Sequence, residues 1–255
     1  MNRFFAESGC IDESTNTVTI TGADVNHIRN VLRLKPGDEI LVNDREGTAY
    51  VCNITEVTSG HVLCEVAFRK NSDTELSSKI YLFQGLPKAD KMELIIQKCV
   101  ELGAYEIVPV ANDRCVMKLS DDAKAANKIK RWNAISEGAA KQSGRGIVPK
   151  VTAPMSMKEA FAYAGEQGID VLLFPYEQAE GMKATAEAFR RVKPGSSVGI
   201  FIGPEGGFSQ KEVELALEKG AAVLSLGKRI LRTETAGLCI ISCLMMQLEM
   251  ESDQS

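Results

Sequence analysis

The stretch SVGIFIGPEGG, residues 197–207, is an apolar run that ends in a glycine-rich turn. Its β-branched and aromatic residues predict a buried strand over residues 197–203. Gly206 and Gly207 permit backbone angles that other residues avoid, so the chain is expected to turn there. Ser209 is followed three residues later by Glu212, which fits a capping box and predicts a helix over residues 209–220.

The same pattern repeats directly afterwards. Residues 222–227, AVLSLG, predict a second strand, and KRILRTETA over residues 228–236 leads into an apolar helix over residues 237–250. Ligands of open α/β sheets bind beyond the carboxyl ends of the strands, so we expect both turns to border one ligand site. Neither turn has the spacing of a phosphate-binding loop, and Pro204 lacks an amide donor, which disfavours a nucleoside triphosphate or a dinucleotide.

Upstream, residues 1–72 read as a small β-rich domain. Alternating patterns predict strands over residues 17–21 and 39–43, with a hairpin formed by residues 50–58 and 61–68. A helix over residues 23–34 is expected to point Val25, Ile28 and Leu32 inward. The polar, aperiodic residues 71–78 are interpreted as the linker to a second domain.

The second domain, residues 73–255, alternates strands and helices. Strands are predicted over residues 80–84, 105–110 and 170–174, and helices over residues 90–102, 121–143 (capped by Ser120) and 179–191. This order predicts an α/β fold with a mainly parallel sheet. The pattern alone favours an ordinary doubly wound sheet, because knotted chains are rare.

Composition narrows the class of protein. The 44% hydrophobic and 25% charged residues are typical of a soluble globular protein, and no apolar segment is long enough for a signal or a membrane span, so the cytoplasm is expected. Seven cysteines without a C-x-x-C motif and two histidines disfavour a metal site. The net charge is −4, yet residues 79–150 carry +5, which fits either RNA binding or a solvated helix surface.

Two motifs carry a specific resemblance. IGPEGGFS (residues 202–209) and LGKRILRTETA (residues 226–236) resemble the ribosomal RNA small-subunit methyltransferase E family, the uracil-N3 enzymes of the SPOUT class. Further matching segments occur in the same order along the chain: HIRNVLR (27–33), LPKADKM (86–92), QKCVELG (97–103) and QSGR (142–145).

This resemblance implies a fold and an activity. It implies a PUA-like β-barrel that binds RNA over residues 1–72, and over residues 73–255 a SPOUT domain whose trefoil knot holds S-adenosylmethionine. The implied reaction is methylation of N3 of a uridine in 16S ribosomal RNA, either free or in the assembled small subunit. Two alternatives stay open, namely methylation of a ribose 2′-hydroxyl or another base, and a non-catalytic RNA-binding assembly factor.

The same resemblance suggests the residues of the cofactor site and of catalysis. Glu205 and Glu234 are the alternative candidates for the general base, although Glu234 also suits a helix cap, and Arg232 is the candidate that stabilises the uracil anion. The predicted cofactor-binding residues lie at three strand ends: Phe174, Pro175, Glu177, Ile202, Gly203, Glu205, Gly206, Gly207, Leu226, Gly227, Ile230, Leu231, Arg232, Thr235 and Ala236.

Contacts with RNA and with a second subunit complete the hypothesis. Candidate RNA contacts are basic or polar side chains of the first 150 residues, for which an ordinary solvated surface position is the alternative: Arg3, His27, Arg29, Arg33, Lys88, Lys91, Lys98, Arg114, Lys141, Gln142 and Arg145. The helix over residues 237–250 is apolar on most of its circumference and requires burial on more than one side, which predicts a homodimer. No membrane partner is expected.

Overall fold

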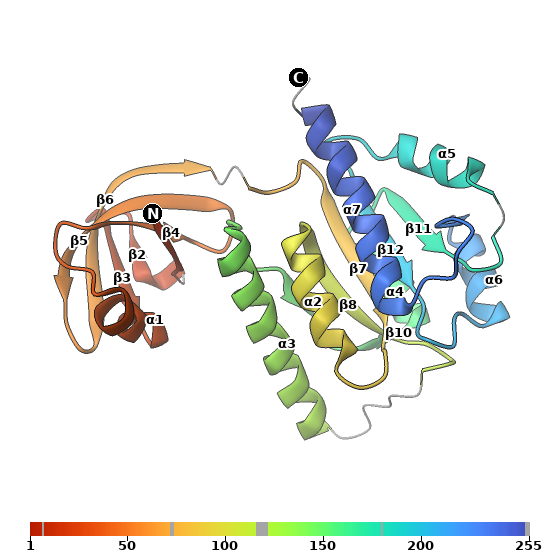
Figure 1. The fold of residues 1–255 in the computed structure, drawn as a ribbon, viewed down its shortest axis with the longest axis horizontal. Coiled ribbons are helices and arrows are strands. Elements are labelled where there is room, and N and C mark those ends of the chain that lie inside the picture. Colours follow the sequence, from red (N-terminus) through yellow and green to blue (C-terminus); the bar gives the residue numbers. More distant parts are fainter. Residues whose placement is uncertain (7, 72–73, 116–121, 180, 253–255) are drawn as a thin grey trace. The chain divides into compact units, whose positions relative to one another are not determined.

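The computed structural model describes residues 1–6, 8–71, 74–115, 122–179 and 181–252. The chain forms two compact units, the first made of Met1–Glu75 and Ala140–Val148, the second of Leu76–Ala139 and Pro149–Ser255 (Figure 1). Residues 140–148 therefore belong to the first unit, although residues 76–139 before them belong to the second. The polar residues 71–78, interpreted as the linker, give no indication that a later segment joins the first unit.

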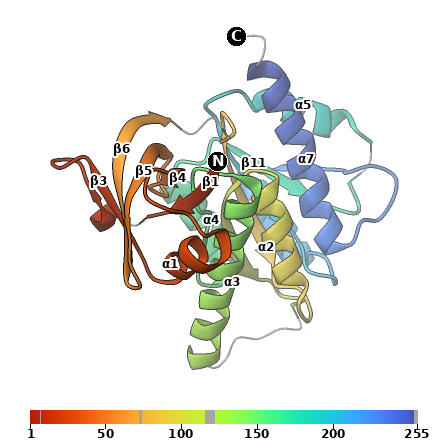
Figure 2. The same ribbon diagram turned by 60° about the vertical axis from the view of Figure 1, so that its left-hand side comes forward.

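The first unit is built on one six-stranded sheet, in the order β1-β4-β5-β6-β3-β2. Its strands are β1 (Asn2–Phe5), β2 (Ile11–Asp12), β3 (Thr17–Thr21), β4 (Glu39–Asn43), β5 (Thr48–Val57) and β6 (His61–Asn71), with a short 3-10 turn at Ser8–Cys10. β1 runs parallel to β4, and the other pairs are antiparallel. Two register shifts in the β5–β6 ladder bend the sheet, and Figure 2 shows its curvature.

The helix expected over residues 23–34 is present in two parts. α1 (Ala23–Asn26) continues as a π-helical turn, His27–Leu32, which ends at Arg33 in the left-handed conformation. Val25 and Ile28 are buried in the core of the sheet and Leu32 packs against it, which confirms the predicted inward face. The four strands predicted in residues 1–72 are also confirmed.

The second unit contains an entirely parallel sheet in the order β10-β8-β7-β12-β11-β13, with β9 paired to β8. This confirms the predicted α/β class. The strands are β7 (Lys79–Gly85), β8 (Ala104–Ala111), β9 (Lys150–Val151), β10 (Met155–Ser156), β11 (Val171–Pro175), β12 (Ser197–Ile202) and β13 (Ala222–Leu224). The helices are α2 (Lys91–Glu101), α3 (Asp122–Ser143), α4 (Met157–Glu166), α5 (Lys183–Arg191), α6 (Gln210–Glu218) and α7 (Thr233–Ser252).

The helices match the predicted ranges to within two residues except at α4, α5 and α7. α4 was not predicted, although Ser156 and Glu159 form the same kind of capping box that Ser209 and Glu212 form at α6. α5 begins later than residue 179, because the chain first turns after β11. α7 begins at Thr233 rather than at residue 237. The proposed cap Ser120 lies outside the described residues.

Side chains on the two faces of the parallel sheet pack against different helices. On one face Phe201 stacks on Phe83 (4.3 Å between ring centroids) and on Phe161 of α4 (4.4 Å). On the other face α2 and α7 pack together over β7 and β12 (Figure 1), with Ile96 and Ile240 completely buried. Within the described ranges, no helix is both long and apolar enough to cross a membrane.

A buried ion pair closes the first unit. Arg145 is 4% exposed, and its Nη2 lies 2.5 Å from Oε2 of Glu75, whose Oε1 accepts the Gly146 amide at 2.9 Å. Arg145 is therefore a structural side chain, and we correct its earlier interpretation as an RNA contact, because the guanidinium is neither exposed nor unpaired. Two more predicted RNA contacts have partners in this unit, since Arg3 donates to the Gly144 carbonyl and Lys141 pairs with Asp24.

Replacing Glu75 with Ala is expected to destabilise the first unit by about 3 kcal/mol, because it leaves the buried Arg145 guanidinium without its counter-charge. Urea unfolding, followed by circular dichroism, measures the change. The matched control is Glu13→Ala, which removes an exposed ion pair to Arg69 and should cost less than about 1 kcal/mol. Equal losses in both variants would contradict the structural role of the Glu75–Arg145 pair.

Candidate functional site

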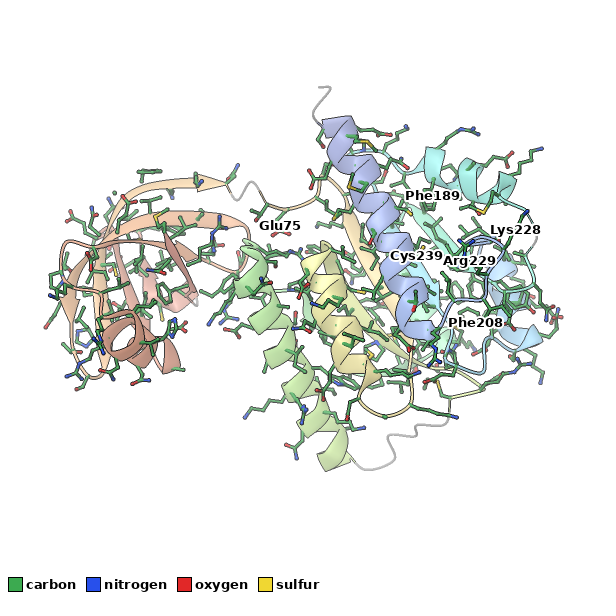
Figure 3. The ribbon with its side chains drawn as sticks, viewed as in Figure 1. Glu75, Phe189, Phe208, Lys228, Arg229 and Cys239 are labelled. Atoms are coloured by element: carbon green, nitrogen blue, oxygen red, sulfur yellow. The ribbon has the colours of Figure 1, made fainter. Side chains whose placement is uncertain are left out.

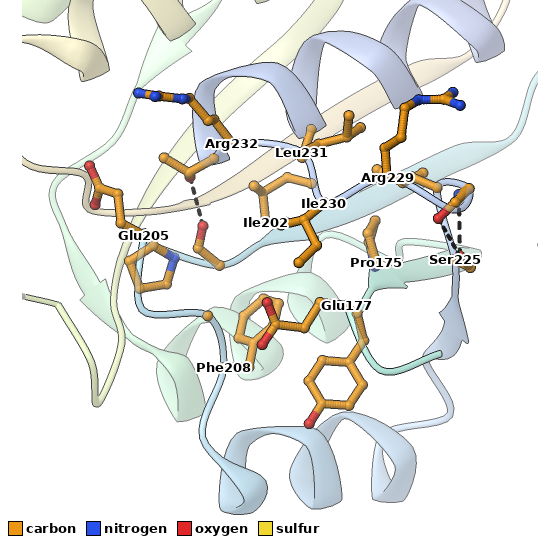
Figure 4. A pocket seen from close by; sticks show the side chains of 18 of the residues that line it. Pro175, Glu177, Ile202, Glu205, Phe208, Ser225, Arg229, Ile230, Leu231 and Arg232 are labelled. Atoms are coloured by element: carbon orange, nitrogen blue, oxygen red, sulfur yellow. Dashed lines mark hydrogen bonds between the residues drawn. The ribbon is translucent and has the colours of Figure 1, made fainter. Parts of the chain in front are cut away.

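A cavity of about 390 Å³ lies at the carboxyl ends of β11, β12 and β13. Three chain segments form most of its border, namely the end of β11 with its following turn, the glycine turn after β12, and the chain between β13 and α7 (Figure 4). The two glycine-marked turns therefore border a single cavity, as expected from their positions at the carboxyl ends of two strands. Their meeting follows from the sheet, because β11 lies between β12 and β13.

Most of the predicted cofactor-binding residues line this cavity: Pro175, Glu177, Ile202, Gly203, Glu205, Gly207, Leu226, Gly227, Ile230, Leu231, Arg232 and Ala236. Three do not. Phe174 is fully buried and packs on Phe208 with 4.1 Å between ring centroids, so it supports the wall from behind. Gly206 packs against Arg114, which donates to its carbonyl at 3.0 Å, and Thr235 lies on the exposed side of α7.

Sequence reasoning missed other residues that line the cavity: Lys91, Tyr176, Pro204, Phe208, Ser225, Lys228, Arg229 and Thr233. All except Lys91 lie within or next to the three segments in which the sequence predicted cofactor contacts, so their position along the chain was the signal that could have identified them. Lys91 comes from α2, and its position depends on the pairing of β7 with β12. No local pattern around residue 91 signals that contact.

Thr233 joins the first turn of α7 to the neighbouring strand ends. Its hydroxyl donates to the Gly203 carbonyl at 2.6 Å and accepts from Nε2 of the buried Gln84 at 2.9 Å. Gly207 has a φ of +66°, and a Cβ there would lie 3.3 Å from Oε1 of Glu177. Glycine is thus favoured by the backbone conformation, and a larger residue there would also have to displace the Glu177 side chain slightly. These contacts fix the relative positions of β7, β11, β12 and α7 around the cavity.

Glu212 fixes the far side of the glycine turn. Its carboxylate is 4% exposed and completes the capping box with Ser209. The same carboxylate accepts from Asn112 Nδ2 at 2.8 Å and from the Asp113 amide at 3.1 Å. The chain leaving β8 is therefore tied to the start of α6.

An ion-pair triad lies at one edge of the cavity. Lys91 Nζ is 3.1 Å from Oε1 of Glu205 and 3.2 Å from Oε2 of Glu234. Hydrogen bonds to Glu205 and then to Glu234 raise the pKa of Lys91. Lys91, expected to contact RNA, is instead engaged by both candidate bases.

The pKa of each carboxylate in the triad reflects opposing effects. Burial is the largest single effect on the pKa of both Glu205 and Glu234, and it acts to raise the pKa. Hydrogen bonds from each residue's own amide and from Lys91 together outweigh burial, aided by Lys88 at Glu205 and by Arg232 at Glu234. The resulting pKa values are lowered, so both groups are ionised at neutral pH.

The rim of the cavity is cationic. Lys228, Arg229 and Arg232 are exposed, and Ile230 beside them is 86% exposed. Figure 4 shows the side chains of Arg229 and Arg232 directed away from the cavity, and Arg229 lies near Cys239 of α7 (Figure 3). Among the residues described, no group of three or more His, Cys, Asp or Glu side chains is arranged to hold a metal ion.

The remaining predicted RNA contacts differ in their surroundings. His27, Arg29 and Arg33 are exposed on or just after the π-helical turn of the first unit. In the second unit Lys88 and Arg114 are exposed, and Lys98 pairs with Glu101 at 2.9 Å. Gln142, in the part of α3 that belongs to the first unit, is also exposed. These assignments stay predictions.

Two family models match the chain. A model described as an RNA methyltransferase domain matches residues 74–245, and one described as an RNA methyltransferase PUA domain matches residues 20–67. The PUA match agrees with the curved sheet of the first unit. It confirms the expectation of a PUA-like domain.

Whole-chain relatives agree with these models. The ribosomal RNA small subunit methyltransferase E of Bacillus subtilis is 39% identical over 98% of both chains, and that of Mesomycoplasma hyopneumoniae is 31% identical over 95% of this chain and 98% of its own. A crystal structure of the Neisseria gonorrhoeae protein of that name, bound to S-adenosylmethionine, is 30% identical, with a TM-score of 0.80 and coverage of 97% and 98% of the two chains. The present chain therefore belongs to the ribosomal RNA small subunit methyltransferase E family.

Proposed function

We propose that this protein transfers a methyl group from S-adenosylmethionine to N3 of a uridine in the 16S ribosomal RNA of the small subunit. The observation that carries the proposal is the single cavity enclosed by the glycine turn after β12, the end of β11 and the chain before α7. Its family relatives from Neisseria gonorrhoeae and Legionella pneumophila are described as bound to the same methyl donor. The cytoplasm, where ribosomal RNA is found, is the proposed location.

The residues present fit such a cofactor. Ile202, Leu226 and Leu231 supply apolar walls for an adenine ring, while the missing side chains of Gly203 and Gly227 let a ligand approach the backbone closely. Glu177 adds a carboxylate acceptor beside Gly207, whose lack of a Cβ leaves room for that carboxylate. When bound, the cofactor supplies an electrophilic methyl group on a sulfonium. The cavity's contribution is to hold that methyl in line with the base, since positioning lowers the barrier substantially.

Arg232 is the proposed catalytic side chain. The N3–H bond of uracil must break, and the N3 electron pair then forms the bond to the methyl carbon while the sulfur–carbon bond breaks and its electrons stay on sulfur. Negative charge develops on the uracil as the proton leaves. An exposed guanidinium at the rim can stabilise that charge without crowding the cavity.

RNA contacts are proposed for both domains. Residues 1–72 would contribute His27, Arg29 and Arg33, and residues 73–255 would contribute Lys88, Lys98 and Arg114, to which we add Lys228 and Arg229 of the rim. A uracil within a helix cannot reach the cavity, so the target base must be unstacked first. Cationic side chains around the cavity would then hold the phosphates on either side of it.

A homodimer and a trefoil knot complete the proposal. α7 buries Ile240, Ile241 and Leu244 inside its own subunit, yet Met246 and Met250 on its other side are 52% and 54% exposed. A second subunit would cover that face. The knot would be closed by the glycine turn after β12 and the chain before α7, which share one cavity and are joined by Thr233.

Methyl transfer to small ribosomal subunits tests the function. Purified protein, labelled S-adenosylmethionine and unmodified subunits are expected to give one methyl group on N3 of a single uridine, as read by nuclease digestion and mass analysis. Methyl on a ribose 2′-hydroxyl or on another base would contradict the N3 assignment.

Arg232→Ala is expected to lower turnover by about 100-fold or more while S-adenosylmethionine still binds; turnover at the wild-type rate would remove Arg232 from the mechanism.

RNA affinity is expected to fall with salt, because phosphate contacts release counterions. Replacing Arg29 with Gln should lower the slope of log affinity against log salt by about 0.7–0.9, the value of one phosphate contact. Filter binding of a small-subunit RNA fragment over a salt series measures it. Lys158→Gln, an exposed change on α4, serves as the control and should leave the slope at its wild-type value. Identical slopes for Arg29→Gln and wild type would argue against the contact.

Met246→Glu is expected to convert a dimer into a monomer, because it places a charge in the proposed apolar interface. Analytical ultracentrifugation at micromolar concentration measures the change. Leu217→Glu introduces the same charge at an exposed apolar position of α6 and should leave the dimer intact. A wild-type protein that sediments as a monomer would refute the proposal.

A further inference from the structure

We infer that Lys91 is a positioning residue, whose ammonium group joins Glu205 to Glu234 and fixes the edge of the cavity, and that neither carboxylate accepts the N3 proton. The inference rests on the proposed methyl transfer. It assigns Glu205 and Glu234, the two candidate bases, to a structural triad with Lys91. The N3 proton then passes to solvent water, with Arg232 stabilising the uracil anion that remains.

The triad connects three elements that come from distant parts of the chain. Lys91 is the first residue of α2, Glu205 lies in the glycine turn after β12, and Glu234 is in the first turn of α7. The Nζ atom reaches the two carboxylates at 3.1 and 3.2 Å. One side chain therefore holds α2, the glycine turn and α7 in register at the cavity edge.

Glu205 also binds the turn that directly precedes Lys91. The Lys88 amide lies 3.1 Å from its Oε1 and 3.3 Å from its Oε2, so both carboxylate oxygens have partners. The next residue, Ala89, has a φ of +54°, a conformation that residues with a Cβ rarely adopt. Backbone strain of this kind persists only where surrounding contacts impose it, and it is concentrated at functional sites. The turn after β7 is thus held in a set conformation against the glycine turn.

The position of each carboxylate disfavours proton transfer. Glu234 is not among the residues that line the cavity, and its Oε2 faces Lys91. Glu205 lines the cavity, but both of its carboxylate oxygens already accept from the Lys88 amide, and Oε1 also pairs with Lys91. A general base works best with a pKa near the working pH. The ammonium group of Lys91 moves both carboxylates away from that condition, because it lowers the pKa of each.

Lys91→Met tests the positioning role. Loss of the ammonium leaves two carboxylates facing each other, so the Kd for S-adenosylmethionine is expected to rise about tenfold, measured by calorimetry. Lys91→Arg, which keeps a cation with several donors, should restore part of the affinity. The matched control is Arg131→Met. It removes the cation that pairs with Glu93, which lies on α2 like Lys91, and neither Arg131 nor Glu93 lines the cavity. A Kd for Lys91→Met equal to that of this control would overturn the inference.

Glu205→Gln and Glu234→Gln test whether either residue is the base. If both are structural ties, each variant weakens cofactor binding, and the pH profile of kcat keeps the wild-type shape. A general base would behave differently, with kcat lowered about 100-fold or more at an unchanged cofactor Kd. That result for either variant would overturn the inference. Circular dichroism shows whether each variant folds, and Lys91→Gln replaces Lys91→Met if the latter does not.

The outcomes separate this inference from the proposed function. If the wild-type protein binds S-adenosylmethionine but transfers no methyl to ribosomal subunits, the proposed function fails. The dependence of cofactor Kd on Lys91 would still support the positioning role. If methyl transfer proceeds at N3 while the Lys91 variants bind cofactor normally, the function stands and the positioning role fails.

Discussion

The hydroxyl of Thr233 makes the contact on which the cavity depends. It donates to the carbonyl of Gly203 and accepts from the buried amide of Gln84, so the start of α7 is fixed to the ends of β12 and β7. Parallel strands place such ends at one edge of a sheet, but they do not by themselves bring a later helix onto that edge. Together with the ion pair between Lys91 and Glu234, this bond places the chain between β13 and α7 opposite the glycine turn.

Several charged side chains of this protein are paired with one another inside a unit. Residues 79–150 carry a net +5, which from the sequence alone fits an RNA-binding surface. In the structure Arg145 neutralises Glu75, Lys91 joins two carboxylates, and Lys98 pairs with Glu101. The exposed cations of the rim, such as Arg229 and Arg232, come instead from a segment whose surroundings are acidic in composition. Local contacts, not regional charge, therefore decide which side chains are free to meet a polyanion.

Features with a local cause were predictable from the sequence. The capping box at Ser209 gave the start of α6, and alternation gave most strands, because side chains next to one another along the chain determine both. An equally clear box at Ser156 marks the start of α4, so that helix was predictable in the same way. Features that arise from long-range contacts could not be read in this way. The return of residues 140–148 to the first unit and the triad at Lys91 each join segments far apart in sequence, and neither leaves a local pattern.

The cavity also explains why different residue types serve its interior and its rim. Inside, glycine backbone and aliphatic walls leave few side chains whose loss would selectively remove a ligand contact, since a backbone donor survives every substitution except one to proline. Its geometry is instead held at its edges, by Thr233, by Glu212 and by the ion pairs of Lys91. Substitutions of these supporting residues would therefore alter binding through the shape of the cavity. Substitutions at the rim, where Arg232 is exposed, would alter the chemistry while that shape stays intact, and this separation is what makes the two roles experimentally distinguishable.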